Sequence, residues 1–450
     1  MEKFMKELLK QIFSLVSVSV LFVTLINIGP MVSATVPYNN SKVSLDASGN
    51  QANDASSYEA GSISVSKDGR YTTFSSTATN LVSGDTNGFP DIFVKDKVTG
   101  SISRVNVYSN GAQSTSDGAI FSKISADGRF VAFTTTESID GSDTTANDLY
   151  VRDLVNTTTE LVSVRTSQAY MNINDDFDIS GDGRYIVFST TASNLVSGDT
   201  NSTSDVFVRD RMLGTTTLLT KTSGGTLGNG YSKDVSISCE GSIIAFNSAA
   251  TNLVSGDTNG YTDTFILNRV GGDNLKNITI GGNASSSFHL WTDVSCDGSN
   301  VAFVSTATNL VSPNLSNNKR NVFVYNNYAQ SVSIASLRNN GSEANDDSYY
   351  PTISSDGSYL AFQSNATDLV AGDTNSTEDV FLRDRVGATT ERVSMRNSST
   401  EASIWSVTPT MTLDGRYILY TSRDTGLVSG DTNNRDDVFR SETGVPACNI

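Results

Sequence analysis

A short acidic loop recurs along this chain and offers the oxygen atoms that hard metal ions prefer. Its first copy reads Asp85-Thr-Asn-Gly-Phe-Pro-Asp91, with carboxylate or amide oxygens at loop positions 1, 3 and 7. Oxygen-only loops are typical of Ca²⁺ sites, and extracellular Ca²⁺ modules bind at about 10⁻⁴–10⁻³ M. The candidate ligands in the five complete copies are Asp85, Asn87 and Asp91; Asp199, Asn201 and Asp205; Asp257, Asn259 and Asp263; Asp373, Asn375 and Asp379; and Asp431, Asn433 and Asp437.

The same residue types have a second use that needs no metal. Asp and Asn side chains accept backbone N–H bonds in Asx-turns, which hold a tight loop in place. The loop also lacks an acid at position 5 and the bidentate Glu of an EF-hand. Calcium binding and Asx-turns therefore both remain open. Because five copies share the pattern, we expect an architectural role rather than catalysis.

These loops recur because the whole chain is a repeat. An Asp-Gly or Glu-Gly pair marks each of seven units, and successive pairs are 55 to 59 residues apart. The marker residues are Asp68, Asp127, Asp182, Glu240, Asp297, Asp356 and Asp414. Self-similarity at a fixed period of this length indicates a propeller or a solenoid. We expect one domain over residues 35–450, because the seven units leave no room for a second.

Each unit carries the pattern of four short strands. The Asp-Gly pair is a strong signal for a tight hairpin between the first two strands. One aromatic residue follows six positions after every marker, and another stands in every strand of the Asp-x-Phe-Val type. This pattern predicts an all-β fold, a seven-bladed β-propeller with four antiparallel strands per blade. A strand at residues 42–46 is expected to complete the seventh blade and close the ring, which removes an exposed edge.

The repeat resembles that of a known family. Ile-Ser-x-Asp-Gly-Arg-Tyr-x-x-Phe followed by Asp-x-Phe-Val-x-Asp is similar to the WD-like propeller repeat of the TolB family, over nearly all of residues 42–445. For function, the resemblance implies a docking module, a periplasmic scaffold or a lid on a peptidase. TolB itself resembles a six-bladed propeller behind a separate N-terminal domain. We therefore expect a stand-alone propeller rather than TolB.

The fifth unit departs from the others. Its loop, residues 314–321, loses the Asp pattern and contains Lys319 and Arg320, whose charges argue against a metal cation there. The same unit holds the only histidine, His289, two positions before Trp291. In propellers the segments that lead into the first strands share a face with these loops, around the mouth of the central channel.

We expect a ligand-binding face centred on this blade, because aromatic side chains are favoured anchors in binding sites. The candidate ligand-binding residues are His289, Trp291, Lys319, Arg320, Tyr350 and Trp405. The alternative for any single ring is that it packs between blades, since large aromatic side chains are mostly buried.

The first 34 residues predict an export signal. Lys3, Lys6 and Lys10 form a basic start, residues 12–29 are an apolar run, and a small-residue pattern predicts cleavage after Ala34. The alternative is an uncleaved anchor, because a run of this length is near the lower limit for spanning a membrane. We expect a secreted or periplasmic protein that contacts a membrane only if the signal is uncleaved.

Charge and cysteine content exclude some classes of function. The formal net charge of −17 opposes binding to nucleic acid or anionic lipid. Cys239, Cys296 and Cys448 are too few for a disulfide framework. Cys239 and Cys296 share one repeat position, but a bridge needs Cα atoms within about 7 Å. We expect free thiols and a monomer.

Catalytic motifs have little support in this sequence. One histidine leaves at most one histidine-based nucleophile system, and neither a G-x-S-x-G elbow nor a zinc-ligand cluster is present. We expect a non-catalytic binding or scaffold module for a protein or glycan, with calcium as a possible stabilising ion. The alternatives are a carbohydrate-active or other hydrolytic enzyme with paired acids, and a structural component of an envelope or matrix.

Overall fold

The structure is a computed structural model that describes residues 39–57, 62–115, 118–139, 147–165, 173, 176–283 and 291–446. These residues form strands, bridges and turns, and contain no helix. Accordingly, no helix suited to crossing a membrane is found within the described ranges. The predicted export signal lies outside the described residues, as do His289 and Cys448.

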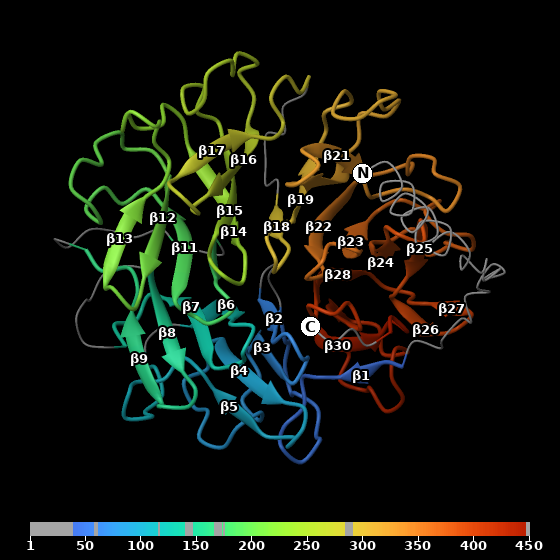
Figure 1. The fold of residues 1–450 in the computed structure, drawn as a ribbon. Coiled ribbons are helices and arrows are strands. Elements are labelled where there is room, and N and C mark those ends of the chain that lie inside the picture. The colour runs from blue at the N-terminus through green and yellow to red at the C-terminus, as the bar shows by residue number, and fades with distance from the viewer. Residues whose placement is uncertain are drawn as a thin grey trace, which may run out of the picture. The chain divides into compact units, whose positions relative to one another are not determined.

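Seven four-stranded antiparallel sheets follow one another around a ring (Figure 1). Blade one contains β2 (Ile63–Val65), β3 (Tyr71–Ser76), β4 (Asp91–Asp96) and β5 (Ile102–Arg104); blade two contains β6 (Ala119–Ile124), β7 (Phe130–Thr135), β8 (Asp148–Asp153) and β9 (Thr158–Leu161). Blade three contains β10 (Phe177–Ile179), β11 (Tyr185–Thr190), β12 (Asp205–Asp210) and β13 (Thr215–Leu218); blade four contains β14 (Ser232–Ile237), β15 (Ile243–Ser248), β16 (Asp263–Asn268) and β17 (Asn274–Asn277).

The remaining three blades continue the same order around the ring. Blade five contains β18 (Thr292–Val294), β19 (Asn300–Ser305), β20 (Asn321–Asn326) and β21 (Ser331–Ile334); blade six contains β22 (Ser348–Ile353), β23 (Tyr359–Ser364), β24 (Asp379–Asp384) and β25 (Thr389–Arg392). Blade seven contains β28 (Ser406–Met411), β29 (Tyr417–Ser422), β30 (Asp437–Glu442) and β1 (Ser41–Lys42), and a small hairpin of β26 (Met395–Asn397) and β27 (Thr400–Glu401) precedes it. The predicted seven-bladed fold is confirmed.

The N-terminal strand closes the ring as predicted. β1 pairs antiparallel with β30, with Lys42 opposite Phe439, and the Val43 N–H donates to the Val438 carbonyl at 2.8 Å. β1 spans two residues, Ser41–Lys42, rather than the predicted 42–46. The difference arises because the chain turns at Asp46, whose Oδ1 accepts two backbone N–H groups further along the turn.

The predicted aromatic residues form one ring pair in every blade, tilted in blade one and stacked in the other six. In blade one, Phe74 of β3 lies directly opposite Phe93 of β4, with ring centroids 6.0 Å apart. The other six pairs have centroid distances between 5.6 and 6.1 Å. All of these rings are buried. Such pairs contribute about 0.5–1.5 kcal/mol each beyond the burial of their area, so they help hold the second strand to the third in every blade.

The marker turns join neighbouring blades on one face of the ring. The Lys67 N–H donates to the Ala126 carbonyl of the next blade at 3.0 Å. Gly128 adopts φ of +74°, and a Cβ at this position would lie 2.5 Å from the Tyr71 ring of blade one. Only glycine combines that backbone conformation with that close approach. The Asp-Gly marker is therefore an inter-blade contact as well as a hairpin turn.

The expectation of free thiols is wrong for two of the cysteines. Cys239 and Cys296 form a disulfide between the marker turns of blades four and five, with Cα atoms 4.6 Å apart. The Cys239 N–H also donates to the Cys296 carbonyl at 3.0 Å. The blade-to-blade contact of the marker turns brings two cysteines that are 57 residues apart in sequence within bonding reach.

Candidate functional site

The acidic loop of blade one closes on an arginine of the same blade. Asp91 begins β4, Asp85 lies in the loop before it, and both carboxylates are buried. Arg104 contacts Asp85 through Nη2 at 3.3 Å and Asp91 through Nε at 2.8 Å. The sheet register places Arg104 there, because it stands directly opposite Phe93. The guanidinium thus lies against both acids, where a shared metal ion would have to bind.

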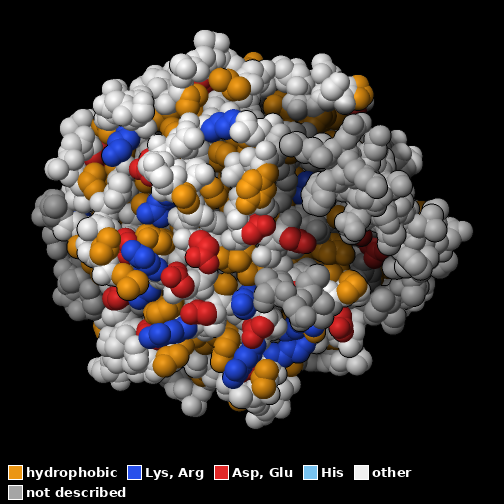
Figure 2. Space-filling model, in the orientation of Figure 1, with side chains coloured by type: hydrophobic (Ala, Val, Ile, Leu, Met, Phe, Trp, Pro, Cys, Tyr) orange, Lys and Arg blue, Asp and Glu red, His pale blue; other side chains and the backbone are white. Residues whose placement is uncertain are grey.

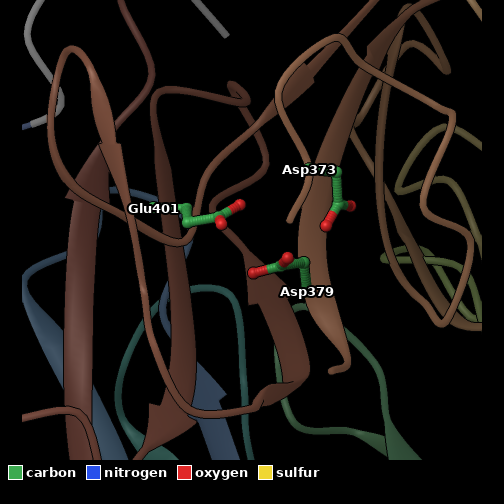
Figure 3. A group of neighbouring side chains, drawn as sticks. All are labelled: Asp373, Asp379 and Glu401. Atoms are coloured by element: carbon green, nitrogen blue, oxygen red, sulfur yellow. The ribbon is translucent and has the colours of Figure 1, made fainter. Parts of the chain in front are cut away.

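Blade six repeats this arrangement with a third acid. The carboxylates of Asp373, Asp379 and Glu401 lie within 4.8 Å of one another, a spacing that could hold a metal ion (Figure 3). Arg392 Nη1 contacts all three carboxylates, with distances of 3.3 Å to Asp373 and 3.1 Å to Asp379. Burial still raises the pKa of Asp373 to about 6, against the opposing effect of Arg392. A metal ion would compete here with a cation that the chain already supplies.

In blades seven and two the cation comes from other parts of the chain. Lys42 of β1 contacts Asp431 at 2.9 Å and Asp437 at 2.7 Å, and its side chain is 4 % exposed. In blade two, Arg165 contacts Asp148 at 2.7 Å from beyond the end of β9. Four of the blades therefore supply an internal counter-ion to the acids of this loop.

The five candidate asparagines all form Asx-turns. Asn87 Oδ1 accepts the Phe89 N–H at 3.1 Å, and its Nδ2 donates to the Ser114 carbonyl at 3.1 Å. The same two contacts, to the residue two positions on and to the segment leading into the next blade, are made by Asn201, Asn259, Asn375 and Asn433. Each asparagine thus pins its loop to the next blade, and its amide oxygen is already engaged.

The acids of blades three and four differ from the others. Asp199 and Asp205 are buried in blade three, as are Asp257 and Asp263 in blade four. Within the described residues, no Lys or Arg forms an ion pair with any of the four. Burial raises the pKa of Asp199, Asp205 and Asp257, and the neighbouring acid raises the pKa of Asp199 and Asp257 further.

A second acidic feature lies in the middle of the ring, where the first strands of the blades line a cavity of about 250 Å³. Four aspartates and two lysines supply its charged lining: Asp176, Asp178, Asp234, Asp293, Lys67 and Lys123. Acidic side chains gather near the middle of the face shown in Figure 2. In the sequence this group is marked only by the charged residues Lys123, Asp178 and Asp293, at a first-strand position that is Ser or Thr in the other four units.

Three of the four channel carboxylates, those of Asp176, Asp178 and Asp293, accept backbone N–H groups of a neighbouring blade. Asp176 accepts the N–H groups of Asp234 (3.0 Å) and Val235 (2.9 Å), and Asp293 accepts the Ile353 N–H at 2.8 Å. Burial, and next the negative charge of Asp234, raise the pKa of Asp176 to about 7. Burial is also the main cause that raises the pKa of Asp293 to about 7. These groups therefore change charge near neutral pH.

Aromatic rings stand at the wall of this cavity. Trp291 and Tyr350 both line it, with ring centroids 4.0 Å apart. Tyr349 lies behind them, 6.0 Å from Trp291 and 5.6 Å from Tyr350. The Tyr349 hydroxyl donates to Glu378 at 3.0 Å. Two of the predicted ligand-binding residues, Trp291 and Tyr350, are thus brought together beside the channel carboxylates.

Three other predicted ligand-binding residues, Lys319, Arg320 and Trp405, are not part of the cavity lining. Lys319 pairs with Asp346 at 2.7 Å, and the Arg320 N–H donates to Asp347 at 2.8 Å. Both acids belong to the segment that leads into β22 and its tyrosines, so this loop supports the aromatic cluster. Trp405 is half-buried one blade further on, just before β28. His289 is outside the described residues.

No protein-family model matches the sequence, and no curated protein matches it. Among solved structures, an oligogalacturonate lyase from Vibrio parahaemolyticus is similar at 13% identity and a TM-score of 0.55, over 90% of this chain and 97% of that one. An oligogalacturonate lyase in complex with manganese matches at 14% identity and a TM-score of 0.54, over 91% and 97%. TolB from Acinetobacter baumannii matches at 16% identity and a TM-score of 0.40, over 67% of this chain and 58% of TolB.

At these identities the likeness shows the fold alone. The chain is a seven-bladed β-propeller protein, and its resemblance to TolB-type repeats is loose.

Proposed function

We propose that the chain is an exported binding module whose channel mouth takes a cationic group of a protein partner, such as a lysine or arginine side chain. One observation carries the proposal: four aspartates and only two lysines line a cavity walled by Trp291 and Tyr350. A cation held near carboxylates gains Coulomb energy, and aromatic faces add cation–π attraction of about 0.5–2 kcal/mol. An anionic glycan would instead meet repulsion from the same aspartates.

Export is supported by two independent features. The N-terminal pattern is that of a secretory signal. The Cys239–Cys296 disulfide is the kind of bond that persists in oxidising compartments and is rare in the cytosol. Fractionation of cells into cytosol, envelope and medium, with the N-terminal sequence of the recovered protein, tests export and cleavage after Ala34 together. Recovery of the full-length chain from the cytosol would overturn the export proposal.

The intrinsic fluorescence of Trp291 offers a direct binding assay. The chain has two tryptophans, so Trp405→Phe leaves Trp291 as the sole reporter. Titration with capped tetralysine should give a saturable change in emission, and capped tetraglycine should give none. Because a hydrogen bond to a charged group contributes about 1.5–3 kcal/mol, Asp234→Asn should weaken binding about tenfold or more.

Matched variants make this assay decisive. Asn tolerates the positive φ of 57° at position 234, so Asp234→Asn preserves the backbone. Asp273→Asn removes the same charge from an exposed turn and should leave the affinity unchanged. A wild-type titration without saturable change, or equal weakening in both variants, would overturn the proposal.

A second candidate function is hydrolysis of a carbohydrate. It is favoured by the carboxyl groups of Asp176 and Asp293, whose pKa values of about 7 lie in the range that general acid–base catalysis uses. The test is release of reducing ends from neutral and uronate-containing oligosaccharides by the wild type and by Asp293→Asn. Turnover that is lost in the variant would favour this candidate over the binding module.

A further inference from the structure

In blades one, six and seven the cationic residue of the acidic loop occupies one fixed place in the repeat. It stands on the fourth strand, directly opposite the third-strand aromatic, as Arg104 opposite Phe93 in blade one. Arg392 and Lys42 hold the same place in blades six and seven. Their contacts fall on the same carboxylate oxygens: Oδ2 of the acid that begins the third strand, and Oδ1 of the loop acid.

In blade five, uncharged residues replace both the acid that begins the third strand and the cation of the fourth strand. Asn321 begins its third strand in place of the acid, and Ile334 stands opposite Phe323 at the cationic place. No buried charge is left to neutralise at these two positions. The pattern of these four blades therefore indicates that buried acids at this place require a cation.

Blade three breaks this rule. It keeps both acids, Asp199 and Asp205, but Leu218 stands opposite Phe207 where the cation belongs. Asp205 is fully buried and Asp199 is 8 % exposed. Asp205 Oδ1 accepts the Thr220 hydroxyl, whereas Asp205 Oδ2 and Asp199 Oδ1 are buried without a hydrogen-bond partner. These are the two atoms that contact Arg or Lys in the sister blades.

Blade four is a partial case. Asn277 occupies the cationic place opposite Phe265, and its amide oxygen accepts the Thr279 N–H at 2.9 Å. Its NH₂ group is a neutral polar group that lowers the pKa of Asp257, although Asp257 Oδ1 is buried without a hydrogen-bond partner. Blade three has only the aliphatic side chain of Leu218 at this place, so its two acids lack even a neutral polar group there.

The available donors in blade three are all oxygens. In blade six Arg392 Nη2 also donates to the Gly372 carbonyl, 3.0 Å away, next to the loop acid. Gly198 is its equivalent beside Asp199. Two carboxylates and a backbone carbonyl form a donor set that suits hard cations such as Ca²⁺ and lacks the nitrogen or sulfur that softer metals select.

We propose that blade three binds one hard divalent cation, Ca²⁺ being the ion to test, between Asp199 and Asp205, at the place that Arg104, Arg392 and Lys42 fill in their own blades. The ion would neutralise two buried carboxylates with which no Lys or Arg of the described residues forms an ion pair. This site is independent of the channel mouth. It narrows the calcium expectation from five loops to one, because the acids of blades one, six and seven already hold a cationic side chain and Asn277 fills the same place in blade four.

The test is equilibrium Ca²⁺ binding to the metal-free chain, measured by isothermal titration calorimetry at neutral pH, with MgCl₂ as a competitor. Leu218→Arg installs the sister-blade cation and should remove one bound ion per chain relative to the wild type. Asp205→Asn should also remove one ion, and asparagine is already accepted at this place in blade five as Asn321.

The matched control is Asp91→Asn, which makes the same change in blade one, where Arg104 fills the place. It should leave the number of bound ions unchanged. A wild-type chain that binds no Ca²⁺ would overturn the proposal. The negative charge of Asp199 and Asp205 would then be reduced by a proton that the two carboxylates share. Equal stoichiometry in the wild type, Leu218→Arg and Asp205→Asn would overturn the proposal as well.

Discussion

Removing the cation from the closing blade gives a quantitative test of these buried ion pairs. Lys42 joins β1 to the last blade through Asp431 at 2.9 Å and Asp437 at 2.7 Å, and all three side chains are at most 4 % exposed. Lys42→Met keeps the length and apolar stem of the side chain but leaves two buried acids without a counter-ion. Removing one partner of a buried ion pair costs about 3–5 kcal/mol, so the free energy of unfolding should fall by about that amount.

The pH dependence has a defined sign. Burial already raises the pKa of Asp437, and Lys42 opposes that rise. In Lys42→Met the pKa of this acid should therefore rise further above its unfolded value. An acid with a raised pKa in the folded state binds protons more tightly there than when unfolded, so low pH favours folding. The loss in free energy of unfolding, relative to the wild type, should therefore be small near pH 4 and grow as pH rises through the raised pKa.

The assay is guanidinium unfolding at several pH values, with a compensated variant as control. Lys42→Met combined with Asp431→Asn and Asp437→Asn removes the acids together with the lysine, as blade five does naturally with Asn321 and Ile334. It should recover most of the lost stability, because neutral replacement of a whole buried pair is often close to neutral. The reasoning is refuted if Lys42→Met is as stable as the wild type, or if the triple variant recovers nothing.

Two further predictions concern the contacts between blades. Replacing both Cys239 and Cys296 with Ser should lower the free energy of unfolding by about 4 kcal/mol, because the disulfide closes a loop of 57 residues in the unfolded chain. In denaturant titrations, a reductant should lower the stability of the wild type to the same level and leave the stability of the variant unchanged. Gly128→Ala should destabilise the fold by about 1–3 kcal/mol more than Gly100→Ala, because both have φ of +74° but only Gly128 faces a ring at 2.5 Å. Equal thermal midpoints for these two variants would show that the inter-blade contact at Gly128 carries no energetic weight.

The blade architecture could be predicted because it depends on local patterns. Phe74 and Phe93, with their counterparts in six other units, mark paired strands at a constant spacing, and each Asp-Gly marks a hairpin. Ring closure could be predicted for the same reason, since residues near Lys42 match the strand type that the seventh unit lacks. These inferences need only the order of residues along the chain.

The charge balance of the loops could not be predicted, because it depends on sheet register and ring closure. Arg104 faces Asp91 only through the pairing of β4 with β5, and Lys42 meets Asp437 across a separation of 395 residues. The disulfide was missed for a similar reason, since its 4.6 Å Cα separation comes from blade packing. The channel aspartates were missed because one Asp in a short strand gives no sign that three others face it.

The most direct test of the proposed function is the pH dependence of tetralysine affinity, measured by isothermal titration calorimetry between pH 6 and pH 8. The ligand keeps its charge over this range, because lysine has a pKa of about 10.4. The carboxyl groups of Asp176 and Asp293 lose their protons within it, since both pKa values are about 7. The affinity should therefore rise about tenfold or more with pH in the wild type, and less in Asp293→Asn. An affinity that is constant, or that falls as pH rises, would contradict the assignment of the channel carboxylates as the cation-binding site.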